Sequence, residues 1–299
     1  MDSATASPPP EPPFGATTII DTMIGFPSSD RSQVYKFLAP SLRDKESLED
    51  FKMPAQYMFK NVPAEIAEGV DPVAVTLMNM DTYGVAKGMV NVGNDAREEP
   101  RRAVRDFPDR FLPCIDVDPR QGMDAVRRIK SFHDEWGVVA VTSFPSGTST
   151  PINAAPYYPV YAACVELGLP IFLTAGVPGP RVPLGPQKVE LLDEVCWFFP
   201  ELKVVMRHGA EPWEDLAVKL MLKWPNLYYS TSAFAPKHYP KAIIDYANSR
   251  GADKVLYAGY FPAGLSYDRI MAELPNVPFK DEVWPKFLGA NAARVLGLS

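Results

Sequence analysis

The stretch TTIIDTMIGFP, residues 17–27, decides the fold because it contains a first strand and the loop that leaves it. The β-branched run ATTIIDT within and just before it is typical of a buried strand. Seven further apolar runs follow along the chain, separated by stretches with a helical pattern. The strands are predicted at 16–22, 86–92, 110–118, 137–143, 169–175, 202–208, 226–232 and 254–260.

Segments with a helical pattern fill the spaces between these strands. They are predicted at 71–84, 99–107, 121–135, 157–167, 186–198, 213–224, 239–250 and 281–296. Continuous apolar strands that alternate with helices indicate a parallel sheet covered on both faces. Eight such units in a chain of 299 residues predict a (β/α)8 TIM barrel. A doubly wound dinucleotide-binding sheet fits less well, since no glycine-rich phosphate motif follows the first strand.

The predicted barrel domain covers residues 16–299. One further segment precedes it and another is inserted within it. Residues 1–15 form a proline-rich N-terminal tail, which is either disordered or an arm that lies over a neighbour. The segment 25–61 is a long insertion after the first strand, rich in charged and aromatic residues. It leaves the carboxyl end of that strand, the face where TIM barrels carry their active sites. We therefore expect the insertion to be a lid over the pocket or a dimer contact.

Composition excludes several classes of partner and location. A net charge of −6 and a pI near 5.2 leave no basic face for nucleic acid. No apolar run reaches the ~20 residues that span a bilayer, and the N-terminus has no secretory pattern. The widely spaced cysteines predict neither a disulfide framework nor a zinc knuckle, so we expect a cytoplasmic protein. All three are expected in packing roles: Cys114, Cys164 and Cys196.

Five strings, in order and on the predicted elements, resemble one family of barrel enzymes. They are IIDTMIGFP at 19–27, YYPVYAACVELGLPIFLTAG at 157–176, LKVVMRHGAEPW at 202–213, KVLYAGYFP at 254–262 and GANAARVLGL at 289–298. Together they are similar to the amidohydrolase-related family that includes aminocarboxymuconate-semialdehyde decarboxylase. The resemblance covers nearly the whole predicted barrel. It implies a hydrolase or a decarboxylase and, because many members are dimeric, a homodimer or higher oligomer.

The same resemblance locates the family's metal ligands, and most of them are replaced. Met23 and Gly25 stand at the two histidine positions of the first strand, and Thr174 stands at the histidine position of the fifth. Tyr260 stands at the aspartate position of the eighth strand, whereas His208 keeps the histidine of the sixth. A catalytic zinc needs three protein ligands and an open position. We therefore expect no metal and no other cofactor.

Loss of a metal would restrict the chemistry. A bound metal lowers the pKa of water from about 15.7 to about 7, which is on the order of 10 kcal/mol of hydroxide activation. A single general base supplies only roughly 3–5 kcal/mol. Difficult amide hydrolysis is therefore not expected. Ester or lactone opening, hydration or dehydration, and loss of CO₂ from an activated acid remain open.

The candidate catalytic residues follow the strand ends. His208 is either a general acid or base or a relic held by hydrogen bonds, and Tyr260 is either a proton donor or a filler of the vacated metal site. Glu211 could orient His208 or act as an acid, or could be a solvated residue at a helix start. Arg181 is the candidate clamp for a substrate carboxylate, although a surface role is equally consistent. Thr174 is a candidate hydrogen-bond donor or a space filler.

Three further positions of interest lie near strand ends. Met23 and Ser143 are candidate substrate-binding residues, but no nucleophile motif surrounds Ser143. Asp21, just before the replaced histidines, is expected to point away from the pocket or to make a structural hydrogen bond.

Three hypotheses for function result. In the first, the chain is a metal-independent hydrolase or carboxy-lyase that acts on a small carboxylated or cyclic substrate. In the second, it is a non-catalytic pseudoenzyme barrel that binds a ligand or joins an assembly. In the third, it is a metal hydrolase with rearranged ligands, formed by His208 and Glu211 with Asp116 or Asp118.

Overall fold

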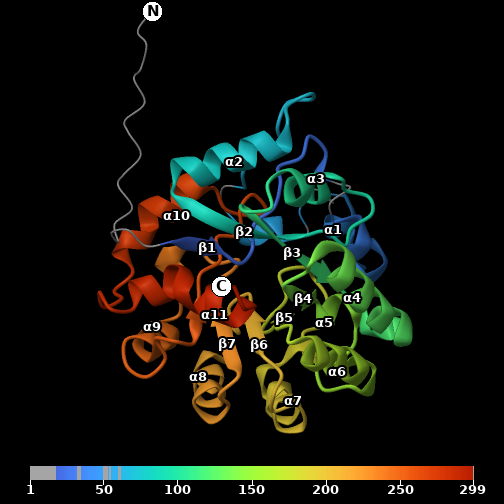
Figure 1. Cartoon of the computed structure of the whole chain (residues 1–299), viewed down its shortest axis with the longest axis vertical. Helices are drawn as coiled ribbons and strands as arrows, with labels where there is room; N and C mark the ends of the chain where they lie inside the picture. Colours follow the sequence, from blue (N-terminus) through green and yellow to red (C-terminus); the bar gives the residue numbers. More distant parts are fainter. Residues whose placement is uncertain (1–17, 32–34, 50–52, 54, 60–61, 299) are drawn as a thin grey trace, which may run out of the picture.

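A computed structural model of the chain describes residues 18–31, 35–49, 53, 55–59 and 62–298, so the predicted tail lies outside the described residues. Eight parallel strands pair in chain order, in the middle of the molecule in Figure 1. All eight predicted strands are confirmed, and most are shorter than predicted. Their bounds are β1 Ile19–Asp21, β2 Val85–Asn91, β3 Phe111–Asp116, β4 Ala140–Ser143, β5 Ile171–Thr174, β6 Val204–Arg207, β7 Leu227–Ser230 and β8 Val255–Leu256.

The sheet closes into a barrel where the segment after β8 meets the segment after β1. The amide of Thr22 donates to the carbonyl of Tyr257 over 3.2 Å. Ile24 and Phe261 form a parallel bridge just beyond the two strands. The amide of Gly25 then donates to the carbonyl of Phe261 over 2.7 Å. The predicted (β/α)8 TIM barrel is therefore confirmed, and the loops after β1 and β8 run side by side.

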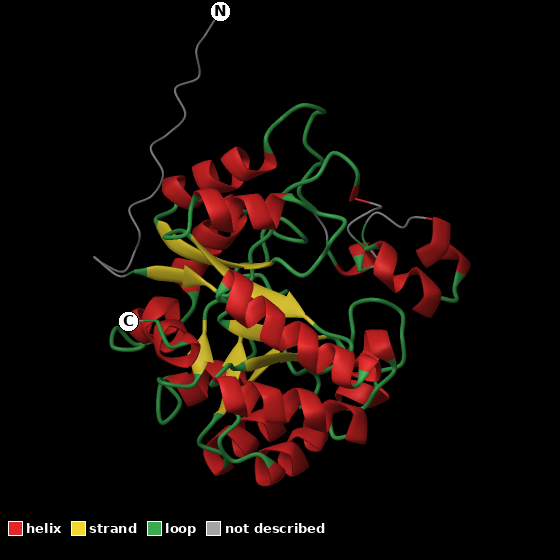
Figure 2. Ribbon diagram, turned by 45° about the vertical axis from the view of Figure 1, so that its right-hand side comes forward, coloured by secondary structure: helices red, strands yellow, loops and turns green. Residues whose placement is uncertain are grey.

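Helices surround the strands in both views (Figures 1 and 2). Those predicted from the sequence are α2 Pro72–Thr82, α3 Glu99–Asp106, α4 Met123–Trp136, α6 Tyr158–Leu167, α7 Leu192–Phe198, α8 Glu214–Lys223, α9 Lys241–Ala247 and α11 Asn291–Leu296. Among the described residues, three more α-helices were not predicted: α1 Lys45–Glu49, α5 Pro145–Thr148 and α10 Tyr267–Glu273. Within the described residues, no helix is both long and apolar enough to cross a membrane.

Capping residues explain where several helices begin and end. The side chain of Asp71 accepts a hydrogen bond from the amide of Val73, and Pro72 occupies the first turn of α2. Gly137 and Gly168 end α4 and α6 with φ values of 61° and 68°, a left-handed conformation that costs glycine little. These helix ends are therefore set by local sequence.

Alternation along the strands divides the core into an outer layer and a barrel interior. One set of strand residues packs against the helices. The other set fills the interior and continues into α11, whose residues cover the amino end of the barrel near the C label in Figure 1. The interior set is Ile20, Met89, Leu112, Cys114, Ala140, Phe172, Val205, Tyr228 and Leu256, with Ala292, Val295 and Leu296 from α11. Space for a ligand is therefore left at the carboxyl end.

The described part of the predicted insertion packs over that carboxyl end. It contains the short helices η2 Lys36–Ser41, α1 Lys45–Glu49 and η3 Gln56–Met58, which lie outside the main group of helices in Figure 2. The hydroxyl of Ser41 donates to the carbonyl of Gly147 (3.0 Å), in the segment after β4. The hydroxyl of Tyr57 donates to the carbonyl of Gly179 (2.7 Å), in the loop after β5.

Candidate functional site

A cavity of about 1560 Å³ opens at the carboxyl ends of the strands. Its floor is a polar layer made by the last inward-facing side chain of five neighbouring strands. These are Asn91, Asp116, Thr142, Thr174 and Arg207. Each lies two residues beyond a residue of the apolar interior on the same strand, as a period of two requires. The insertion contributes to the wall through Tyr35, Leu38, Ala55, Met58 and Phe59.

Arg207 and Asp116 carry opposite charges into this cavity. The Nε atom of Arg207 is buried and has no hydrogen-bond partner among the residues that the structure describes. Asp116 lines the cavity, and its Oδ1 accepts a hydrogen bond from the hydroxyl of Thr142 (2.8 Å). Burial raises the pKa of Asp116, while the charge of Arg207 opposes that rise. Burial lowers the pKa of Arg207, but a guanidinium stays charged in proteins.

His208 lies next to Arg207 and also lines the cavity. Its φ of 66° places it in the left-handed region, which turns it out of the strand alternation and lets both residues reach the same space. The hydroxyl of Ser232 and Nδ1 of His208 are 3.0 Å apart. Burial, together with the charge of Arg207, lowers the pKa of His208 to about 3. The imidazole is therefore neutral at pH 7.

Tyr260 contacts His208 edge to face, with ring centroids 5.3 Å apart. It stacks on Phe59 of the insertion at 6.0 Å, and its φ of 64° is also left-handed. Burial raises the pKa of its hydroxyl, so the phenol remains a proton-bearing group. Tyr260 and Met23 also line a smaller recess of about 140 Å³ beside the main cavity.

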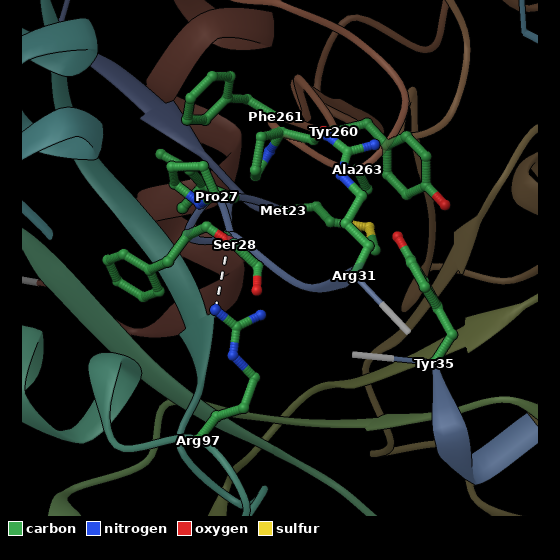
Figure 3. A pocket seen from close by; sticks show the side chains of 13 residues that line it. Met23, Pro27, Ser28, Arg31, Tyr35, Arg97, Tyr260, Phe261 and Ala263 are labelled. Atoms are coloured by element: carbon green, nitrogen blue, oxygen red, sulfur yellow. Dashed lines mark hydrogen bonds between the residues drawn. The ribbon is translucent and has the colours of Figure 1, made fainter. Parts of the chain in front are cut away.

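Figure 3 shows this recess. In this view the hydroxyl of Tyr35 points toward the thioether of Met23, and the ring of Tyr260 lies to one side of them. Arg97 stands on the opposite side from Tyr260, and Arg31 runs between Met23 and Tyr260 in this view. Both guanidinium groups donate to backbone carbonyls. Nη2 of Arg97 donates to Phe26 (3.3 Å), and Nη2 of Arg31 donates to Pro63 and Pro262.

Five of the seven predicted site residues line the main cavity: Met23, Thr174, His208, Glu211 and Tyr260. Burial, with a smaller effect of the neighbouring Glu214, raises the pKa of Glu211. Thr174 is buried on the floor.

The other two predicted residues do not line it. Arg181 is bound through Nη1 to Asp44 and Glu46 of the insertion, each at 2.7 Å, and stacks over Tyr57. Two carboxylates already satisfy its charge, so Arg181 is not free to act as the predicted clamp for a substrate carboxylate. Ser143 is fully buried, with its hydroxyl 2.9 Å from the hydroxyl of Tyr157 and 2.9 Å from the carbonyl of Val117.

The donor set of the cavity can be compared with what a divalent metal requires. At the positions that the family resemblance assigns, the cavity offers His208 together with a thioether, a glycine, a hydroxyl and a phenol. In the part of the chain that the structure describes, no three His, Cys, Asp or Glu side chains are grouped so that they could hold a metal ion. The rearranged ligand set predicted as an alternative, His208 and Glu211 with Asp116 or Asp118, is therefore not brought together either. The residues present do not fit a catalytic metal with three protein ligands.

Sequence reasoning missed Asn91, Thr142 and Arg207, and it considered Asp116 only as a metal ligand. The alternation would have identified them, because each follows the interior side chain of its own strand by two positions. A TIM barrel with charged and polar side chains gathered at the carboxyl ends of its strands has the layout of a barrel enzyme.

The sequence model of the amidohydrolase family matches residues 49–298. The chain therefore belongs to the amidohydrolase family, as the resemblance predicted. No curated protein matches it.

Solved structures with the same fold cover nearly the whole chain. An uncharacterised TIM-barrel protein from Bordetella bronchiseptica is 21% identical, with a TM-score of 0.70 over 94% of this chain and 98% of that one. The 5-carboxyvanillate decarboxylase from Novosphingobium aromaticivorans, solved with manganese and 4-hydroxy-3-methoxy-5-nitrobenzoic acid, is 16% identical (TM-score 0.69; 95% and 97% covered). The 2,6-dihydroxybenzoate decarboxylase from Rhizobium is 15% identical (TM-score 0.62; 94% and 99%). At these identities the likeness shows the fold.

Proposed function

We propose that the chain is a carboxy-lyase that removes CO₂ from a small carboxylic acid without a metal ion. The observation that carries the proposal is the pair of charged groups on the cavity floor. Arg207 presents a guanidinium whose Nε is unsatisfied, and no described carboxylate lies within ion-pair distance of it. Asp116, whose pKa is raised by burial, faces the same space. The floor thus combines a fixed positive charge with a carboxyl group that burial makes easier to protonate.

These two groups match the two needs of decarboxylation. When the bond to the carboxyl carbon breaks, its electron pair moves into the rest of the substrate, and CO₂ leaves. Arg207 stabilises the oxygen that takes up this charge, the electrostatic task for which preorganised donors are most effective. Asp116 donates its proton to the carbon that bears the carboxylate, after CO₂ has left a β-keto acid or before it leaves an aromatic ring, so that R–COO⁻ and H⁺ become R–H and CO₂. Water in the open cavity returns a proton to Asp116.

Hydrolysis fits the same site less well. It needs a base that activates water, and the best base has a pKa near the working pH. With a pKa of about 3, His208 is a poor base at pH 7 and carries almost no proton to give as an acid. We assign it the role of a neutral hydrogen-bonding group that orients the substrate, together with Tyr260 as a donor. Thr174 and Met23 shape the floor and side of the same cavity.

The named relatives suggest the substrate class. Both decarboxylases act, by name, on benzoates that carry phenolic oxygens. Once a proton has been added to the ring carbon that bears the carboxylate, the phenolic oxygen beside it becomes a carbonyl. This carbonyl takes up the electron pair as CO₂ departs, and it is the oxygen that Arg207 would stabilise. We therefore infer a hydroxylated aromatic acid, or a β-keto acid with the same electron sink. The insertion, which forms one wall of the cavity, would act as its lid.

The test is CO₂ release from hydroxybenzoates and β-keto acids by protein dialysed against a chelator. We expect release by the metal-free protein and a loss of roughly 10²-fold or more in kcat/KM for Arg207→Met and Asp116→Asn. Arg181→Met is the matched control, because that guanidinium is held outside the cavity by Asp44 and Glu46. Release that appears only after manganese or zinc is added would refute metal independence.

Two other outcomes would decide between the hypotheses. Equal loss in the Arg181 and Arg207 variants would remove the assigned role of Arg207. Tight binding of 4-hydroxy-3-methoxy-5-nitrobenzoic acid without turnover of any acid in the panel would instead support a ligand-binding pseudoenzyme barrel.

A further inference from the structure

We propose that Asp21 is a positioning residue whose carboxylate fixes the loops after β1 and β8, and thereby sets Met23 and Tyr260 in the cavity. The inference rests on the proposed function only in taking Tyr260 as a residue of the site. Asp21 itself does not line the cavity and is completely buried. Its effect is therefore exerted through the backbone.

The contacts of Asp21 join three separate parts of the chain. Its Oδ1 accepts hydrogen bonds from the amides of Met23 and Gly259, each over 2.9 Å. Its Oδ2 accepts a hydrogen bond from the hydroxyl of Tyr267 in α10 over 2.7 Å. Hydrogen bonds to an ionised acceptor are roughly twice as strong as neutral ones. A single carboxylate therefore ties the end of β1 to the loop after β8 and to the helix that follows that loop.

These bonds act directly on the backbone of Tyr260. Gly259 immediately precedes it, and the amide of Tyr260 donates in turn to the carbonyl of Met23 over 3.1 Å. The φ of 64° at Tyr260 is unfavourable for a side chain of this size, so the surrounding contacts have to impose it. Gly259 permits the close approach, because a Cβ there would lie 2.6 Å from Oδ2 of Asp21. The geometry points to Asp21 as the group that holds this conformation.

A purely stabilising role explains the carboxylate less well. Burial raises the pKa of Asp21 to about 6, so the ionised form is disfavoured inside the protein. A neutral side chain at this place would avoid that cost. The negative charge of Asp21 is useful because it holds three hydrogen-bond donors, the amides of Met23 and Gly259 and the hydroxyl of Tyr267, in one arrangement.

The test follows the tyrosine ring without requiring turnover. We would place 3-fluorotyrosine at position 260 and record its ¹⁹F resonance in Asp21→Ala and Asp21→Asn, together with amide exchange at Met23 and Gly259. Tyr257→Phe is the matched control, since Tyr257 is an equally buried neighbour whose hydroxyl has no hydrogen-bond partner within the described part of the chain. We expect a shifted or split resonance and roughly tenfold faster exchange in the Asp21 variants, and neither change in the control.

The outcomes separate this inference from the proposed function. A ¹⁹F resonance of folded Asp21→Asn at the wild-type position would overturn the positioning role of Asp21. If Asp21→Ala does not fold, the result for Asp21→Asn alone tests the inference. A structural role alone would lower the unfolding temperature of the Asp21 variants while leaving the resonance of the folded protein in place. Absence of CO₂ release would remove the proposed function and leave the ¹⁹F result standing.

Discussion

Replacement of Asp21 by asparagine is expected to change how the stability of the protein depends on pH. Burial raises the pKa of this carboxyl from its ordinary value of 3.8 to about 6. Between those two pH values the folded chain holds a proton on Asp21 that the unfolded chain has released. The folded state is therefore stabilised as the pH falls through about 6, and the gain is complete below about 3.8. The amide side chain of the Asp21→Asn variant does not titrate in this range, so the variant serves as the baseline.

The magnitude follows from the same two values. The difference between about 6 and 3.8, multiplied by about 1.36 kcal/mol per pH unit, gives about 3 kcal/mol. We would measure the free energy of unfolding in urea for the wild type and Asp21→Asn at several pH values between 7 and 4. The wild type minus the variant should rise by up to about 3 kcal/mol as the pH is lowered.

A difference that stays constant, or that falls on acidification, would refute this reasoning. It would mean that Asp21 titrates at or below its ordinary pKa, and that the three hydrogen bonds outweigh the effect of burial. Other titrating groups are common to both proteins, so they cancel in the subtraction unless they contact Asp21.

Three further predictions concern the barrel and its cavity. Gly289→Ala should destabilise the fold by about 3 kcal/mol or more in urea unfolding, because the new Cβ would overlap the backbone oxygen of Thr18; a stable variant would show that β1 can move. The thiols of Cys114, Cys164 and Cys196 should react with a disulfide reagent at pH 8 only after unfolding, because burial raises the pKa of each to about 12. Labelling of these cysteines in the native protein would contradict this prediction. A rise in salt from about 0.05 to about 0.5 M should weaken binding of a nitrobenzoate probe, measured by titration, because its charge pairs with a guanidinium in an open cavity; unchanged affinity would argue against ionic anchoring.

The barrel could be predicted because its information is local. Apolar strands and patterned helices recur in order, and each is defined by its own residues. The helix α10 was missed because it is only seven residues long and begins directly after the loop of the eighth strand. Its N-cap, Ser266, accepts a hydrogen bond from the amide of Arg269 over 3.4 Å and was the available clue.

The candidate site was predictable only in part. The family resemblance located Thr174, His208 and Tyr260, which line the cavity. The choice between Arg207 and His208, however, depended on backbone conformation. By a strict period of two, Arg207 faces the cavity and His208 faces away from it. The left-handed φ of His208 breaks this alternation, so both side chains line the cavity. The place of Arg181 depends on carboxylates 137 and 135 positions earlier in the chain, and no local pattern reveals such a pairing.

The position of the insertion has a consequence for how new activities could arise on this scaffold. One continuous segment supplies wall residues from Tyr35 to Phe59, while the strands supply Asp116 and Arg207. The segment that borders the cavity and the strand residues to which we assign the chemistry thus lie in separate stretches of the sequence. Transplanting that segment between relatives would then retune ligand preference without redesigning the reaction, which makes it a natural unit for directed evolution.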